Sequence, residues 1–213
     1  MIKHILFDLD CTLYSVSHGL TEYVSRRLNE YLAGYLGISI EEAAAERKKQ
    51  FQLHGYGTTL EWLIVERGFT ATTEYLTYVH PEDEADSLPP DPQLRSFIEG
   101  LPCPSSILTN APGFHADRII RKLGLEGIFR QVFDIESNAF RGKPNASAFQ
   151  RALDALALKP QEVLFVDDIP SYVKGYLALG GRGILFDERD IYADYPHERI
   201  NNLREIRHIL NIL

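Results

Sequence analysis

The pattern of hydrophobic and polar positions divides the chain into three parts. Residues 3–7 end in a short apolar run without polar alternation, which is typical of a strand buried on both faces of a parallel sheet. Residues 17–81 repeat apolar positions every three or four residues, and glycines separate these repeats. Beyond residue 92, apolar runs alternate with helix-like stretches. The pattern predicts one strand, a helical segment, and a series of strand–helix units.

The third part predicts the remaining elements. We expect strands over 105–108, 131–133, 162–166 and 182–186, and helices over 92–100, 113–123, 145–157, 171–179 and 201–213. Strands separated by helices favour parallel, right-handed βαβ units. The expected fold class is therefore α/β, with a Rossmann-like three-layer α/β/α core around a mostly parallel sheet. Residues 1–15 and 87–213 would form this core, and residues 16–86 a small helical cap inserted after the first strand.

Polar residues stand directly after three predicted strands and before one predicted helix: Asp8 and Asp10, Thr109 and Asn110, Asp167 and Asp168, and Lys143. Open α/β sheets bind ligands at the carboxyl ends of their strands, so we expect these side chains to meet there. Asp8 and Asp10 would share one face if the first strand reached that far. Neighbouring carboxylates repel each other unless a cation or a shared proton compensates them.

This combination predicts metal-assisted chemistry on a phosphate. Mg²⁺ binds one or two carboxylates together with waters and substrate phosphate, and a carboxylate beside it can attack phosphorus. Lys143, the Thr109 hydroxyl and nearby backbone N–H groups would neutralise the phosphoryl oxygens. Taken singly, the same residues have ordinary interpretations as helix caps, strand ends or a surface lysine.

Composition narrows the function classes. The chain has 30 Asp and Glu against 22 Lys and Arg, a net charge of −8, which argues against binding a nucleic-acid polymer but not against a local phosphate pocket. Cys11 and Cys103 are the only cysteines, too few for a disulfide framework or a four-cysteine zinc site. No apolar stretch approaches the roughly 18 residues of a membrane span. We expect a cytoplasmic enzyme without a membrane anchor.

The chain resembles the haloacid-dehalogenase superfamily of phosphohydrolases in four motifs that occur in the family's order: Asp8-x-Asp10-x-Thr12, Thr109-Asn110, Lys143-Pro144 and Asp167-Asp168. These motifs span the chain from end to end. The helical insert lies where that superfamily places its mobile cap. The resemblance implies hydrolysis of a small phosphorylated metabolite, with Mg²⁺ as cofactor.

The resemblance also implies a role for each acid. Asp8 would be the nucleophile and a metal ligand. Asp10 would be the general acid/base, with its backbone carbonyl on the metal. Asp168 would bind Mg²⁺ directly and Asp167 through water. One carboxylate must be ionised while the other is protonated, and a metal and Lys143 near Asp8 would separate the two pKa values in that direction.

The other motif residues would bind the phosphoryl group. Thr109 and Asn110 would contact its oxygens, and Lys143 would orient both the nucleophile and the phosphate. Within the superfamily the chain most resembles the pyrimidine 5′-nucleotidase-like branch, through residues 8–14, 56–60, 90–92, 108–111 and 133–136. That branch implies a pyrimidine nucleoside monophosphate as substrate.

Other interpretations stay open at this point. Ile169 and Tyr172 replace residues that usually support the metal in that branch. A phosphosugar phosphatase or a phosphomutase would show the same motifs, and a non-catalytic binding protein on this fold is a further alternative. His54 and His80 lack a spacing that indicates zinc. Four cap aromatics are candidates for stacking on a base, although their helical spacing favours a place in the cap core: Phe51, Tyr56, Trp62 and Tyr75. The oligomeric state is left open.

Overall fold

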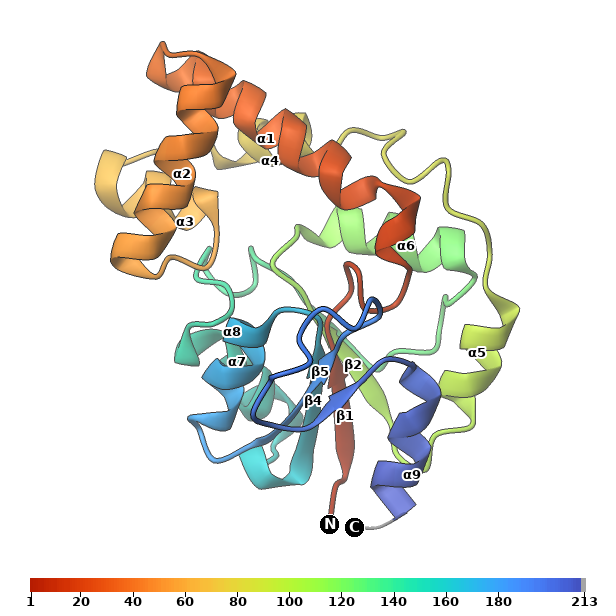
Figure 1. The fold of residues 1–213 in the computed structure, drawn as a ribbon. Coiled ribbons are helices and arrows are strands. Elements are labelled where there is room, and N and C mark those ends of the chain that lie inside the picture. The colour runs from red at the N-terminus through yellow and green to blue at the C-terminus, as the bar shows by residue number, and fades with distance from the viewer. Residues whose placement is uncertain (212–213) are drawn as a thin grey trace.

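A computed structural model describes residues 1–211, and its centre is a six-stranded sheet whose neighbouring strands are all parallel (Figure 1). The strand order is β3-β2-β1-β4-β5-β6. The strands are β1 (His4–Phe7), β2 (Ser105–Leu108), β3 (Val132–Phe133), β4 (Val163–Asp167), β5 (Arg182–Phe186) and β6 (Arg199–Ile200). β1 lies between β2 and β4, and all four of its residues are buried because helices cover both faces of the sheet.

Helices cover both faces of the sheet, and alternate strand residues point to opposite layers. Ile5 and Phe7 pack with α5 (Pro92–Glu99), α6 (Gly113–Leu123) and α9 (Ile206–Asn211). Leu6, between them, packs against α7 (Ala146–Leu156) and α8 (Pro170–Leu177). Within residues 1–211, three short 3₁₀ helices lie in the connections: Val16–His18, Pro160–Glu162 and Leu203–Glu205. The prediction of a three-layer α/β/α fold with a parallel sheet is confirmed.

Four helices stand above the carboxyl ends of the strands as a cap (Figure 1). They are α1 (Leu20–Leu36), α2 (Ile40–His54), α3 (Thr59–Arg67) and α4 (Thr72–Val79). Ser39 and Glu42 form a reciprocal capping box that starts α2, and Gly55 ends that helix in the left-handed region. The helices share their own hydrophobic cluster, which includes Leu32, Leu63 and Trp62. The exact division at residues 15/16 and 86/87 stays a prediction.

The largest differences from the predicted elements lie near the C-terminus. The predicted helix over 201–213 is wrong in its extent, because Asn202 caps a short 3₁₀ helix and the α-helix begins only at Ile206. Residues 212–213 of that prediction lie outside the described residues. The pattern also missed β6, whose two residues pair with the end of β5. Two residues are too few for a periodic signal.

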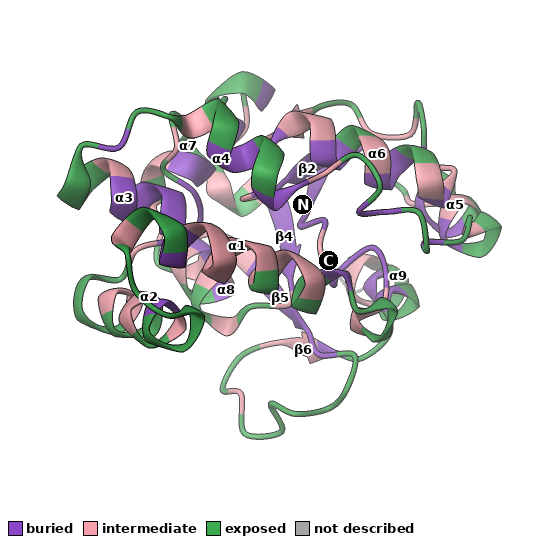
Figure 2. Cartoon of the chain, turned by 90° about the horizontal axis from the view of Figure 1, so that it is seen from above, coloured by how far each residue is buried: buried purple, intermediate pink, exposed green. Residues whose placement is uncertain are grey.

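Exposure follows the layers. Figure 2 shows buried residues along the sheet and on the helix faces turned toward it, whereas the loop between β5 and β6 is largely exposed. The helices are amphipathic covers for the sheet, and within residues 1–211 none is long and apolar enough to cross a membrane.

Packing of the cap can be tested on one helix. Leu63 on α3 is fully buried, and Val65 on the same helix is 53% exposed. We expect Leu63→Ala to lower the free energy of unfolding by about 2–5 kcal/mol, because it removes buried methyl groups and leaves a cavity. The control Val65→Ala should stay within about 0.5 kcal/mol of the wild type. Denaturant unfolding measures both, and equal effects would contradict the packing described.

Candidate active site

The predicted lysine joins two of the predicted carboxylates. The register of β1 and β4 pairs Phe7 with Val166, so Asp8 and Asp167 come to lie next to each other. Lys143 reaches between them from the loop before α7, with its Nζ 2.5 Å from Asp8 Oδ1 and 2.6 Å from Asp167 Oδ2. All three side chains are buried. They form one internal ion cluster.

Two residues after β2 complete this edge of the sheet. The Asn110 side chain pairs with the backbone of Lys143, accepting from its N–H at 2.8 Å and donating to its carbonyl oxygen at 2.9 Å. Asn110 therefore fixes the lysine loop, and its backbone N–H is left for the predicted phosphate contact. The Thr109 hydroxyl accepts from Ala111 N–H at 3.0 Å, so its own hydrogen can be donated into the site.

Three carboxylates could hold a metal ion. Oxygen atoms of Asp8, Asp167 and Asp168 lie within 4.8 Å of one another, and an all-oxygen set suits a hard cation such as Mg²⁺. Both Asp167 oxygens already accept bonds, from Lys143 and from Ile169 N–H at 2.8 Å. Both Asp8 oxygens accept bonds as well, from Lys143 and, at 3.3 Å, from the Thr12 hydroxyl, so these bonds do not separate the predicted direct ligand Asp8 from the predicted water-mediated ligand Asp167.

The charges of this group also fit a cation. Three carboxylates surround a single ammonium. Burial raises the pKa of Asp8 to about 7 against the opposing charge of Lys143. Burial, with the charges of Asp167 and Asp8, raises the pKa of Asp168 to about 9. A divalent cation would compensate the excess negative charge and favour the ionised carboxylates.

Asp10 lies in a turn outside the strand. The strand ends at Phe7 and Cys11 adopts the left-handed region at φ 59°, so strand alternation does not place Asp10 as the sequence pattern suggested. Its Oδ1 instead accepts hydrogen bonds from Tyr14 OH at 2.6 Å and from His115 Nε2 at 2.8 Å. The acid is held by side chains that are not part of the lysine cluster.

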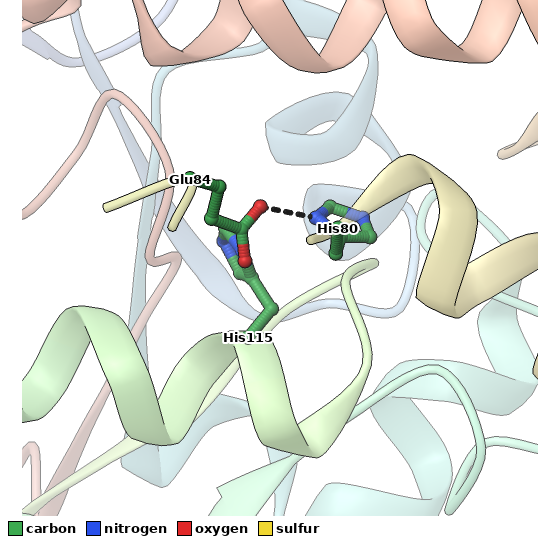
Figure 3. A group of neighbouring side chains, drawn as sticks. All are labelled: His80, Glu84 and His115. Atoms are coloured by element: carbon green, nitrogen blue, oxygen red, sulfur yellow. Dashed lines mark hydrogen bonds and ion pairs between the residues drawn. The ribbon is translucent and has the colours of Figure 1, made fainter. Parts of the chain in front are cut away.

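His115 belongs to a buried cluster that the sequence reasoning missed (Figure 3). Its Nδ1 lies 2.8 Å from Glu84, whose second oxygen lies 2.9 Å from His80 Nδ1. Arg118 donates to Glu84 at 2.7 Å. Both His115 nitrogens face carboxylates, and Glu84 also forms an ion pair with Arg118. We therefore infer that this cluster positions Asp10 and does not offer free metal ligands. His80 and Glu84 come from the segment that leads back from the cap.

Without a metal ion, the cluster gives the two acids the opposite pKa order from the one predicted for Asp8 beside a metal. Burial lowers the pKa of His115, but the carboxylates of Asp10 and Glu84 outweigh it and raise that pKa to about 10. Burial would raise the pKa of Asp10, yet the His115 charge and hydrogen bonds lower it to about 2. With the protein groups alone, Asp10 is therefore the stronger acid and Asp8 the weaker. The expected order assumed a metal beside Asp8 and did not include His115.

One sequence signal could have found His115. It lies on the buried face of α6, where the other buried positions are all apolar: Ala116, Ile119, Ile120 and Leu123. A histidine on such a face needs buried partners. Nothing in the local sequence identifies Glu84 as that partner, because the two residues lie 31 positions apart.

The cap is closed onto the core through polar contacts. Tyr172 OH on α8 donates to Gly57 O at 3.0 Å, and the Asn145 side chain donates to Glu61 of α3 at 3.1 Å. A Cβ on Gly57 would lie 2.2 Å from the Lys143 carbonyl oxygen, so only glycine allows this approach. Tyr172 therefore links the core to the cap. In the pyrimidine 5′-nucleotidase-like branch that the sequence resembles, the residue at this position usually supports the metal.

A cavity of about 290 Å³ lies between the cap and the core. Its floor includes Asp8, Asp10, Thr109 and Asp168, and its roof comes from the cap helices. Of the four aromatic candidates, two line this cavity and two do not: Phe51 and Tyr75 line it, whereas Trp62 is buried in the cap core and Tyr56 bonds to Glu66.

The fold and site together define an α/β enzyme with an acidic centre beneath a cap. The sequence profile of the haloacid dehalogenase-like hydrolases matches residues 2–179, and the chain belongs to this family. The sequence-based identifications of the superfamily and of the enzyme class are confirmed. The pyrimidine nucleotidase branch finds no specific support in these comparisons.

Two curated relatives and a solved structure extend this result. Glyceraldehyde 3-phosphate phosphatase of Methanocaldococcus jannaschii is 27% identical, over 100% of this chain and 99% of its own. Validoxylamine A 7′-phosphate phosphatase of Streptomyces hygroscopicus is 25% identical, over 86% and 84%. A HAD phosphatase from Thermococcus onnurineus has a TM-score of 0.66 at 21% identity, covering 98% of both chains, which shows the shared fold.

Stability should depend on pH through His115. Its folded pKa of about 10 lies above the ordinary value of 6.5, so its contribution is fully present below about pH 6.5 and is lost as the pH rises through about 10. We expect His115→Gln to lower the free energy of unfolding more at about pH 6 than at about pH 10. Denaturant unfolding in chelator measures this, with the exposed-site variant His54→Gln as control. A constant difference across this range would contradict the ion cluster.

Proposed function

We propose that the chain is a Mg²⁺-dependent phosphomonoesterase that works through an aspartyl-phosphate on Asp8. The observation that carries this proposal is the pairing of two separate acids over one cavity. Asp8 lies in the buried cluster with Lys143, and Asp10 is held apart by Tyr14 and His115. Bound Mg²⁺ would hold Asp8 ionised and stabilise charge on the phosphoryl oxygens.

The residues of the chain divide the reaction between them. Lys143 holds Asp8 Oδ1 and fixes the carboxylate for attack on phosphorus. The Thr109 hydroxyl hydrogen and the backbone N–H groups that follow β2 bind the phosphoryl oxygens. The P–O bond to the leaving group breaks as the Asp8–phosphorus bond forms.

Asp10 would serve both halves of the reaction. Its Oδ1 carries the bonds from Tyr14 and His115, so Oδ2 is the atom left for the substrate. Without substrate Asp10 is ionised, and the negative charge of a bound phosphate would raise its pKa, so that Oδ2 can take up the proton that goes to the leaving oxygen in the first half. In the second half, the carboxylate takes a proton from the water that attacks the phosphoryl group on Asp8. Free phosphate and Asp8 result.

The substrate we propose is a small phosphomonoester, best matched by a pyrimidine nucleoside monophosphate. The cavity volume of about 290 Å³ is at the small end of ligand pockets, and its roof places Phe51 and Tyr75 beside apolar side chains. Such a roof suits a flat ring. A sugar phosphate is the second candidate, because both curated relatives are named for phosphate esters that contain no pyrimidine.

Metal dependence is tested on Asp168. We expect Asp168→Ala to abolish phosphatase activity at ordinary Mg²⁺ concentrations, and chelator to abolish it in the wild type, because a direct ligand is lost in each case. A screen of nucleotides and sugar phosphates measures this. Glu188→Ala, an exposed acid near the site, is the control. Full activity of Asp168→Ala, or of the wild type in excess chelator, would contradict the proposed metal site.

Substitutions of the two acids of the first motif, Asp8 and Asp10, should block different steps of the reaction. Asp8→Asn should form no phosphoryl-enzyme, even from an aryl phosphate with a good leaving group. Asp10→Asn should still be phosphorylated in part, because that leaving group needs little protonation, but it should hydrolyse the intermediate roughly 10²–10⁴-fold more slowly. Mass spectrometry of the quenched enzyme detects the adduct. Phosphate on a residue other than Asp8 would overturn the mechanism.

A further inference from the structure

The roof of the cavity contains one cationic side chain with no role in the chemistry proposed above. Arg47 on α2 lines the cavity together with Phe51, one turn further along the same helix. Thr59 at the start of α3 and Tyr75 on α4 line the same roof. These four residues are called the cap subsite below.

Arg47 has neutral partners only. Its guanidinium donates to Asn29 Oδ1 at 2.9 Å and to Ser25 Oγ at 3.4 Å, and it forms no ion pair within residues 1–211. Arg118 and Arg199, also partly buried, each pair with a carboxylate. Burial lowers the pKa of Arg47, because a cation that is withdrawn from water without a counter-charge is destabilised. An oxygen acceptor in the cavity would offset that cost.

Thr59 supplies a second, independent observation. Its side chain is 2% exposed, and its hydroxyl oxygen has no well-formed hydrogen bond among the described residues, although the Tyr75 hydroxyl lies near enough to interact with it. Buried hydroxyls are nearly always hydrogen bonded, so a ligand in the cavity could complete the bonding of this Thr59–Tyr75 pair. Phe51 lies 6.0 Å from the Arg47 guanidinium, measured to the ring centroid, and supplies an aromatic face beside the charge.

We propose that the cap subsite binds a planar oxygen-acceptor group at the end of the substrate remote from the phosphate. Arg47 donates to the acceptor oxygens, the Thr59 hydroxyl adds a further bond, and Phe51 and Tyr75 contact the flat part of the molecule. A carboxylate and the carbonyl oxygens of a pyrimidine base share this chemistry. The inference rests on the proposed function only in placing the phosphoryl group at Asp8. It favours flat substrates with a terminal acceptor over polyol phosphates.

The test uses two matched pairs of substrates with the Mg²⁺-loaded enzyme. One pair is 4-carboxyphenyl phosphate and phenyl phosphate, and the other is uridine 5′-monophosphate and ribose 5-phosphate. We expect Arg47→Met to lower kcat/KM roughly 10- to 100-fold for one or both acceptor-bearing members, mainly through KM, and to leave their partners nearly unchanged. Loss in the first pair identifies a carboxylate, and loss in the second a base carbonyl. Arg67→Met on the exposed side of α3 is the matched control.

Thr59→Val separates recognition from folding. Because it replaces a buried hydroxyl that lacks a well-formed hydrogen bond with a methyl group of similar shape, we expect a nearly unchanged or higher Tm together with a raised KM for the same acceptor-bearing substrates. Replacing a residue with only a structural role would not raise KM while leaving Tm unchanged or higher. Equal effects of Arg47→Met on both members of each pair, or no effect on any, would overturn the proposal.

Binding alone distinguishes failure of the subsite from failure of the proposed reaction. Calorimetry compares 4-carboxybenzylphosphonate with benzylphosphonate, neither of which can be hydrolysed. Tighter binding of the carboxylated compound by the wild type, lost in Arg47→Met, supports the subsite even in a chain that hydrolyses none of the four esters. If neither binding nor hydrolysis depends on Arg47, the subsite is refuted while Mg²⁺-dependent hydrolysis can still stand.

Discussion

The site depends on one buried ammonium between two carboxylates. Removing Lys143, Asp8 and Asp167 from water costs several kcal/mol for each ion, and their mutual attraction offsets this only with close geometry. Strand register supplies that geometry on the carboxylate side, and the Asn110 amide supplies it on the lysine side. The sheet and the loop before α7 therefore cannot shift independently without leaving a charge unpaired.

A second ion cluster, around His115, gives Asp10 a different electrostatic environment from that of Asp8. Asp8 lies in a group whose negative charge exceeds its positive charge, whereas Asp10 faces the His115 cation. The two environments act on chemically identical side chains that are two residues apart. Their separation depends on the turn through Cys11, which directs the chain away from the strand after Asp8. Local backbone conformation thus sets the electrostatic difference.

Sequence pattern predicted the parts that repeat or that end strands. The apolar run before Asp8 and the strand over 182–186 are visible because burial on both faces leaves no polar side chain after the first residue of each strand, His4 and Arg182. The predicted acids, Lys143 and Thr109 meet because parallel strands bring their carboxyl ends to one edge. Their chemical roles remain predictions.

The sequence could not reveal contacts that arise from packing between distant segments. His115 stands out on the apolar face of its helix, but nothing links it to Glu84, which looks like an ordinary polar residue of a linker. Arg47 looks like one more charge on an amphipathic helix, and only the packing of α2, α3 and α4 places it in a cavity. Such relationships have no periodicity, and spacing along the chain does not encode them.

The position of Glu84 has a consequence for selectivity. This residue belongs to the segment joining cap and core, yet its carboxylate holds the histidine that holds Asp10. Movement of the cap about that segment would disturb the orientation of the acid as well as open the cavity. A ligand too small to keep the cap closed would then meet a misaligned Asp10, so induced fit would add to affinity in discriminating among substrates. Water alone, entering an open site, would meet the same misalignment.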